Sequence, residues 1–405
     1  MKRSVLSYPD FRRLLTGSLF TYAAQWMQQA SLAWVAYEIT GSAALLGAIF
    51  AVRAVPMIGL APFAGVAADR YDRRSLLIAS QLASAVTTFA FGAALALHLV
   101  STWMLFLFTL LMGTNAVLDR PARNTMVFEM VPRDAAMKAV GLHSMVFSLN
   151  RMAGPAIAGY LIAYFGATGN FFIQAFLYLI AFAMGFVLSA PKENKRPQEG
   201  SAMKQLLTGL QFLFSDPTIR LILLFGLVPY FLLVPIWSTL LPIYAKDVFH
   251  SGPQGFGVLL AGVGVGATLG GAITVALARF DRQGVIQASA MLVYCASIAG
   301  LAFSPSLAFA IPVSVAGGAS EVVFTTSQMT MLQMSAPEAM RGRVSSMIQL
   351  FPGFISLGAA FCGLLAQVAG ARSASALLAS LCAIIVASFF AASPRLRGLR
   401  LSVYR

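Results

Sequence analysis

A few ionisable side chains lie inside long apolar stretches of this sequence. Asp119 and Arg123 are four residues apart, Glu321 interrupts an apolar stretch, and Arg53 and Arg151 lie near the middle of two others. If these stretches cross a membrane, a charge inside them costs at least ~2.5 kcal/mol on insertion scales. Such positions are therefore candidates for function.

The two carboxylates could take up and release a proton. A carboxylate that alternates between water and a desolvated or Arg-paired place changes its affinity for protons. We therefore expect Glu321 or Asp119 to be the proton-coupling group. For Asp119 an alternative stays open, since it shares one helix face with Arg123 and the two can simply pair. Glu321 forms with Thr325 and Gln328 a polar stripe that can face a water-filled path.

Other polar residues in the apolar stretches could bind a substrate. Arg53 and Arg151 could hold an anionic group, or could form internal ion pairs with the same carboxylates. Asn150 precedes Arg151 and is a candidate for either role. Gln25 and Gln28 form with Thr21 a polar stripe, which could line a cavity or make interhelical hydrogen bonds.

Several familiar kinds of site have no pattern here. The sequence holds no G-x4-G-K-[ST] phosphate loop, so we expect no ATP and no other cofactor, with the proton gradient as energy source. The three cysteines and the three histidines, His98, His143 and His250, have no metal-ligand spacing, so we expect no metal. No nucleophile and base can be paired from the sequence, which argues against an enzyme.

The composition requires a lipid environment. Of 405 residues, 59% are apolar and 10% charged, against roughly 25% charged in soluble domains. Because a membrane helix needs roughly 20 apolar residues, we predict twelve spans. They run over 14–37, 43–67, 75–100, 102–127, 137–164, 168–190, 218–241, 255–278, 284–304, 306–332, 344–369 and 373–393.

Lysine and arginine give the orientation. With the N-terminus inside, one set of loops carries nearly all of them, and the opposite loops hold only Lys246 and Arg372. By the positive-inside rule we expect both termini in the cytoplasm. The net charge of +14 is then a topology signal, and nucleic-acid binding is disfavoured.

The chain is built as two similar halves. Arg70-Tyr71-Asp72-Arg73 after the second span recurs as Arg279-Phe280-Asp281-Arg282 after the eighth. Such repeats let transporters hold a substrate between two halves and expose it to each side in turn. We predict an all-α integral membrane protein with two six-helix bundles, and internal duplication favours a monomer. The predicted parts are residues 1–190 and 217–394 for the bundles, 191–216 for a linker with an amphipathic helix, and 395–405 for a basic tail.

The loop between the second and third spans carries a signature. It reads Gly65-Val66-Ala67-Ala68-Asp69-Arg70-Tyr71-Asp72-Arg73-Arg74 and resembles the major facilitator superfamily motif G-x-x-x-D-R-x-x-R-R. The resemblance implies that Gly65, Asp69, Arg70, Arg73 and Arg74 form a gating motif, in which Asp69 can pair with an arginine or cap a helix.

The fifth span resembles that superfamily's antiporter motif, G-x8-G-x3-G-P-x2-G-G. The residues that match are Gly141, Gly154, Pro155 and Gly159, while Asn150 and Ala158 replace two glycines. The resemblance implies exchange of substrate for protons. The small residues could equally serve helix packing.

A closer resemblance covers most of the N-terminal half. The segments Trp34 to Ser42, Asp119 to Arg123 and Asn150 to Gly159 are similar to the enterobactin-exporter-like branch, also called the transmembrane secretion effector group. It implies export of a small amphipathic molecule, siderophore-like or drug-like, by proton antiport. An importer or uniporter, a lysophospholipid flippase and a non-transporting sensor remain alternatives of the same fold.

Overall fold

The computed structural model describes residues 4–60, 72–189, 216–335 and 351–399, and within these ranges every regular element is helical. Nine helices in this part are long and apolar enough to cross a membrane. One of them, α7 (Ala136–Val187), covers two expected spans, because Gly166 takes a positive φ of 69° and kinks it. The remaining two expected spans correspond to α1 (Pro9–Thr40) and to the shorter apolar segment Ala43–Gly59.

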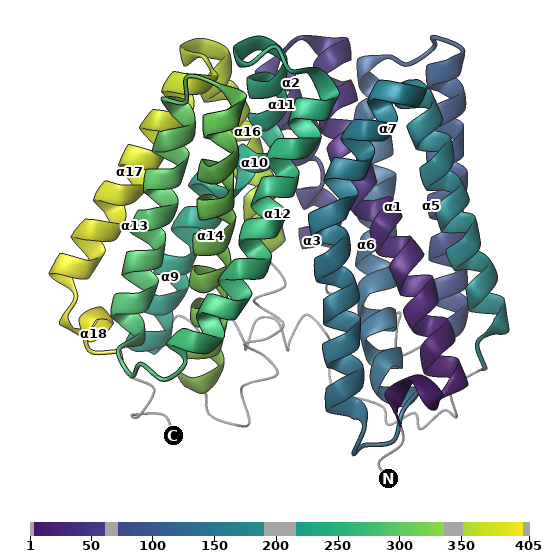
Figure 1. Cartoon of the computed structure of the whole chain (residues 1–405), viewed down its shortest axis with the longest axis horizontal. Helices are drawn as coiled ribbons and strands as arrows, with labels where there is room; N and C mark the ends of the chain where they lie inside the picture. Colours follow the sequence, from purple (N-terminus) through teal and green to yellow (C-terminus); the bar gives the residue numbers. More distant parts are fainter. Residues whose placement is uncertain (1–3, 61–71, 190–215, 336–350, 400–405) are drawn as a thin grey trace. The chain divides into compact units, whose positions relative to one another are not determined.

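Contacts divide the chain into two compact units (Figure 1). Unit 1 comprises Met1–Ile39 and Val55–Ala202, and unit 2 comprises Thr40–Ala54 and Met203–Arg405. The helices of unit 1 are α1, α3 (Ala54–Gly59), α5 (Arg73–Ala96), α6 (Thr102–Glu129) and α7, preceded by the short η1 (Val5–Ser7).

Unit 2 contains one helix from early in the chain and the whole later part. Its elements are α2 (Ala43–Ala51), α9 (Pro217–Leu232), α10 (Val234–Thr239), α11 (Leu241–Ile243), η2 (Tyr244–Val248), α12 (Gly252–Leu277), α13 (Gln283–Ala302), α14 (Leu307–Ser335), α16 (Phe351–Ala369), α17 (Ala371–Ala392) and α18 (Pro394–Arg397). The first four of the later elements follow one another as a broken span, Pro217–Val248.

Glycines explain why α2 groups with unit 2. A Cβ on Gly47 would lie 2.3 Å from the Ala359 carbonyl oxygen of α16, and a Cβ on Gly363 would lie 2.3 Å from that of Ala43. Two helices can approach this closely only where side chains are absent. The contact therefore ties Thr40–Ala54 to α16, although the sequence division places that segment within 1–190.

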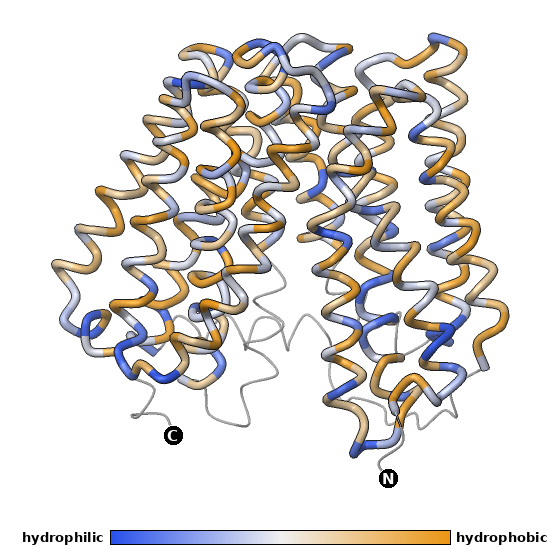
Figure 2. The backbone as a smooth tube through the Cα atoms, viewed as in Figure 1, coloured by the Kyte–Doolittle hydropathy of each residue, from blue (hydrophilic) through white to orange (hydrophobic). Residues whose placement is uncertain are grey.

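Most residues along the helices are apolar, and hydrophilic residues gather mainly at helix ends in each unit (Figure 2). Large apolar side chains such as Val275 and Val368 are 77% and 89% exposed. Water would make such exposure costly, whereas acyl chains solvate it. The fold is thus that of a multi-pass membrane protein.

Candidate functional site

The centre of the candidate site is a buried ion pair on α6. Arg123 donates from Nη2 to Asp119 Oδ1 at 2.8 Å and from Nε to Oδ2 at 3.1 Å. The residues are 2% and 1% exposed, for Asp119 and Arg123 respectively. The pairing suggested by the four-residue spacing is therefore present, and it is a bidentate contact inside a membrane-spanning segment.

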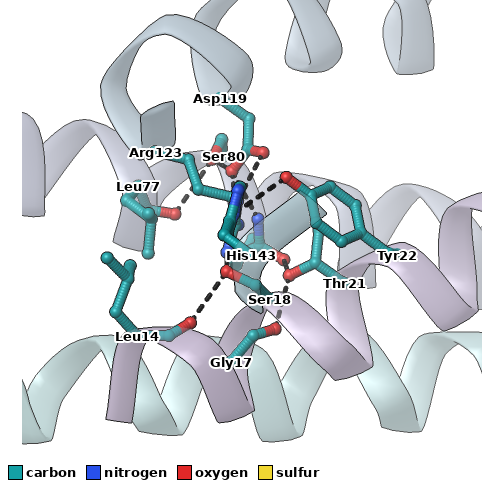
Figure 3. A network of polar contacts seen from close by, with 11 residues as sticks. Leu14, Gly17, Ser18, Thr21, Tyr22, Leu77, Ser80, Asp119, Arg123 and His143 are labelled. Atoms are coloured by element: carbon teal, nitrogen blue, oxygen red, sulfur yellow. Dashed lines mark hydrogen bonds and ion pairs between the residues drawn. The ribbon is translucent and has the colours of Figure 1, made fainter. Parts of the chain in front are cut away.

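Helix α5 supplies further partners for the carboxylate (Figure 3). Gln81 Nε2 donates to Asp119 Oδ1 at 2.7 Å, and the Ser80 hydroxyl lies 3.1 Å from the same oxygen. The side-chain oxygen of Gln81, Oε1, lies 3.1 Å from the Thr21 hydroxyl of α1. Both carboxylate oxygens of Asp119 thus accept hydrogen bonds, and these bonds join α6 to α5 and onward to α1.

The guanidinium makes its own contacts with α1. Arg123 Nη1 donates to Ser18 Oγ at 3.0 Å, and its guanidinium carbon lies 5.8 Å from the centre of the Tyr22 ring. The Tyr22 hydroxyl lies 3.1 Å from His143 Nε2 on α7. The network around the ion pair (Figure 3) therefore includes residues of α1, α5, α6 and α7 in unit 1.

Sequence reasoning missed several members of this network. From the sequence, His143 is considered only as a metal ligand, and Ser18, Ser80 and Gln81 are not singled out. Ser18 precedes Thr21 by three residues and therefore shares its helix face, which was a usable signal. The pairing of His143 with Tyr22 has no such signal, because the two residues are 121 positions apart.

The antiporter-like segment of α7 packs on α1. A Cβ on Gly154 would lie 2.7 Å from the Cβ of Trp26, and nothing lies within 4 Å of one on Gly141. Asn150 donates to the Val146 carbonyl of its own helix at 2.8 Å. This motif thus includes one position of close helix contact and one open position.

The remaining motif residues, Pro155 and Gly159, are buried within α7, and Pro155 lies inside the helix. Arg151 is half-buried, with its guanidinium carbon 5.7 Å from the centre of the Trp26 ring. Of the other substrate candidates on α1, Gln25 is half-buried and Gln28 is 7% exposed.

Arg53 lies in the short connection between α2 and α3 and is half-buried. Contact clustering assigns it to unit 2, whereas Arg151, Asn150, Gln25 and Gln28 belong to unit 1. Whether these residues bind a substrate stays a prediction.

The loop signature is described only in part, since Gly65, Asp69 and Arg70 lie outside the described residues. Arg73 forms an ion pair with Glu129 at the end of α6. Arg74 donates to the carbonyl oxygens of Gly185 at 3.1 Å and Phe186 at 2.7 Å, the last turn of α7. A cation at a helix C-terminus is favourable, so these two arginines tie the start of α5 to two helix ends.

The start of α1 is tied to the end of α7 in a similar way. Asp10 Oδ1 accepts from the Ser189 backbone N–H at 3.3 Å and from Arg13 Nη1 at 3.0 Å. Partial burial of Asp10 raises its pKa, but hydrogen bonds from Ser189 and the nearby Arg13 guanidinium outweigh burial, so the pKa lies below its ordinary value.

Glu321 lies in α14 of unit 2 and is 6% exposed. The Trp237 indole N–H of α10 donates to its Oε2 at 3.2 Å. The indole fits there because Gly317 has no side chain: a Cβ would lie 2.8 Å from the ring. The ring of Tyr294 stacks on Trp237 with the ring centres 6.0 Å apart.

In the expected polar stripe along α14, Glu321 and Gln328 are buried and Thr325 is half-buried, and a water-filled path beside it stays a prediction. Gln328 is fully buried and donates to the Ile222 carbonyl of α9, beside the side-chain-free Gly226. Thr325 is half-buried and bonds to the Val322 carbonyl of its own helix at 3.2 Å. Glu321 and Gln328 face neighbouring helices. There Glu321 accepts from the Trp237 indole and Gln328 donates to the Ile222 carbonyl, so both buried side chains have a hydrogen-bond partner.

The helical architecture defines the class of the protein. The crystal structure of the nucleoside transporter NupG superposes with a TM-score of 0.78 at 15% identity, covering 95% of this chain and 98% of that one. The protein therefore has the major facilitator fold, as predicted.

The family follows from the sequence match. Residues 3–401 match the family described as "Transmembrane secretion effector", and the chain belongs to this family of transporters. It is 24% identical over 365 residues to the staphyloferrin A transporter of Staphylococcus aureus, covering 88% of this chain and 89% of that one. It is also 24% identical over 399 residues to the multidrug efflux pump Tap of Mycolicibacterium fortuitum, covering 96% and 97%. The chain is thus a small-molecule transporter and not an enzyme.

Proposed function

We propose that the chain exports a small amphipathic molecule, siderophore-like or drug-like, across the bacterial inner membrane in exchange for protons, by alternating access of a single chain. Family membership supports transport, and the similarity to a staphyloferrin A transporter and a multidrug efflux pump supports this substrate range. The observation that supports proton coupling most directly is the buried Asp119–Arg123 pair.

In this proposal a proton and the guanidinium compete for one carboxylate. Protonation of Asp119 removes its charge and with it the charge-assisted bonds from Arg123. Breaking a buried pair in this environment costs about 3–5 kcal/mol when one charge is left uncompensated. Protonation is therefore favourable only together with a change that gives Arg123 new partners or access to water.

The network converts that local event into helix movement. Asp119 and Arg123 lie on α6, and their partners Gln81 and Ser18 lie on α5 and α1. When the pair opens, the bonds that fix these three helices at this depth weaken together. The loaded and unloaded states of the carboxylate then favour different packings of unit 1, which is the requirement for exchange.

Glu321 is the second candidate for the same step. It is a buried carboxylate inside a membrane-spanning helix, and its contact with the Trp237 indole crosses from α14 to α10. Protonation would weaken this contact, so proton uptake at Glu321 would loosen unit 2 rather than unit 1. Separate variants distinguish the two carboxylates.

The test is flux in proteoliposomes with an acidic lumen, screened over a siderophore, a cationic drug and a lysophospholipid. We expect accumulation of a siderophore or drug that collapses when an uncoupler is added. Asp119→Asn should abolish this gradient-driven accumulation. Glu321→Gln is measured beside it, so that the two variants show which carboxylate takes up the proton.

Other outcomes identify the alternative functions. Flux that is insensitive to the uncoupler would show a uniporter, and transport of the lysophospholipid alone would show a flippase. Absence of flux for every compound, with a folded protein, would contradict export and favour a sensor. Unchanged accumulation in both carboxylate variants would contradict proton coupling at either place.

A further inference from the structure

Four exposed arginines lie at one end of unit 2. Arg279 and Arg282 belong to the connection between α12 and α13, and Arg395 and Arg397 belong to α18. We call these four residues the arginine patch. Figure 1 shows α18 and the α12–α13 connection at the same end of this unit.

Helix α18 is held against the start of α13. The Gly284 N–H donates to the Leu399 carbonyl at 3.4 Å, and Leu396 and Leu399 are 0% and 4% exposed. A Cβ on Gly284 would lie 1.8 Å from the Leu396 carbonyl oxygen, so only glycine allows this contact. The leucines thus point inward while the arginines of α18 remain exposed, and the two pairs of arginines belong to adjoining segments.

The patch adjoins the ends of three helices that can span the membrane. Helices α12, α13 and α17 each satisfy the length and hydropathy of a membrane span. Arg279 and Arg282 lie in the five residues between the first two, and α18 begins two residues after α17 ends. All four side chains can therefore reach phosphates at the membrane surface. The distribution of lysine and arginine assigns this end to the cytoplasmic leaflet.

The positive charge of the patch is available to a ligand. Within the described ranges, no ion pair joins any of the four arginines to an aspartate or glutamate. The nearby Asp216 already accepts the N–H groups of Thr218 and Ile219 as the N-cap of α9.

An aromatic side chain accompanies the charge. Phe280 is 48% exposed, and the guanidinium carbon of Arg279 lies 5.2 Å from the centre of its ring. At a membrane surface such an apolar ring can enter the boundary of the acyl chains while the neighbouring cation meets phosphate.

We propose that the arginine patch binds the headgroup of an anionic phospholipid and so anchors α18 and the α12–α13 connection to the leaflet. Guanidinium groups suit this ligand because they form paired hydrogen bonds with phosphate oxygens. The fixed position of α18 presents two arginines together with those of the connection, which a freely moving tail would not. This inference does not depend on the substrate or on proton coupling.

The experiment uses the purified full chain in a neutral detergent, with phosphatidylglycerol as the probe. Lipid binding is followed by native mass spectrometry and by the rise in apparent Tm, with phosphatidylcholine and free glycerol 3-phosphate as separate arms. We expect phosphatidylglycerol to bind and to raise the Tm, and the other two to have little effect. Arg395→Gln with Arg397→Gln should weaken its binding about 30-fold, because each arginine near an anionic surface strengthens binding about fivefold.

The matched control removes two exposed positive charges from unit 1, one in the connection between α6 and α7 and one in the first turn of α7, as Arg133→Gln with Lys138→Gln. This variant should bind the lipid like the unaltered chain, and Gly284→Ala should lose binding because α18 can no longer dock. Equal loss in both double variants would show a general surface-charge effect and overturn the site. So would unchanged binding in the Arg395/Arg397 variant, an equal effect of phosphatidylcholine, or saturation by glycerol 3-phosphate alone.

Discussion

Replacing Arg123 by methionine tests the energetic importance of the buried pair. Asp119 would keep only the neutral donors Gln81 and Ser80, with its charge 2% exposed and no guanidinium beside it. Loss of one partner from a buried pair costs about 3–5 kcal/mol. For a cooperative unit of 150–250 residues this corresponds to a Tm lower by roughly 6–20 °C.

The double variant Asp119→Leu with Arg123→Met separates charge from packing. It removes both charges at once, and apolar replacements of buried pairs are often neutral or stabilising. The remaining loss is the neutral bonds of Ser18, Ser80 and Gln81, at ~0.6 kcal/mol each in a membrane protein. We therefore expect the double variant to be destabilised by about 2 kcal/mol, less than Arg123→Met alone.

The assay is the apparent Tm of the purified protein in detergent, measured by intrinsic fluorescence. Ser80→Ala is the control, since it removes one neutral contact and should lower the free energy of unfolding by ~0.6 kcal/mol. A double variant that loses as much stability as the single variants Arg123→Met and Asp119→Leu combined would show no coupling between the charges. That result would refute the assignment of Asp119–Arg123 as a strongly coupled pair.

Three further predictions concern helix contacts and caps. Gly154→Val should lower both expression and Tm, because its Cβ would lie 2.7 Å from that of Trp26, whereas Gly141→Ala should change stability by less than ~0.5 kcal/mol; equal effects would contradict the α1–α7 contact. Arg74→Gln removes two bonds to the C-terminal carbonyls of α7 and should cost roughly 1 kcal/mol, measured by Tm at low salt. The lowered pKa of Asp10 means that its contribution to stability is complete above its unfolded value, about 3.9, and is lost as the pH falls through the lower folded value; the Tm advantage over Asp10→Asn should therefore shrink in acid and not in alkali.

The membrane helices could be predicted because they depend on local composition. Runs of about 20 apolar residues give each span independently of its neighbours. The pairing of Asp119 with Arg123 was accessible for the same reason, since both lie on one helix four residues apart. The continuity of α7 across two spans could not be predicted, because it depends on the backbone conformation of Gly166, which joins the two spans by a kink and not by a separate loop.

Partners on other helices could not be predicted from spacing. The faces that α1, α5 and α7 turn toward α6 depend on helix rotation, which side-chain packing sets over the whole unit. Only that packing brings Tyr22 to His143 and Gln81 to Asp119. The partner of Glu321 could not be predicted for the same reason. Its donor Trp237 lies in α10, which belongs to a span with a broken helix, and the indole reaches the carboxylate past Gly317.

The most direct test of the proposal compares two modes of transport in one protein. In proteoliposomes, Asp119→Asn should still exchange labelled for unlabelled substrate at equal pH on both sides, which shows a folded and moving transporter. The same variant should not accumulate substrate when the lumen is acidic, because the proton has lost its carboxylate. Accumulation equal to that of the unaltered chain would contradict proton coupling through the Asp119–Arg123 pair.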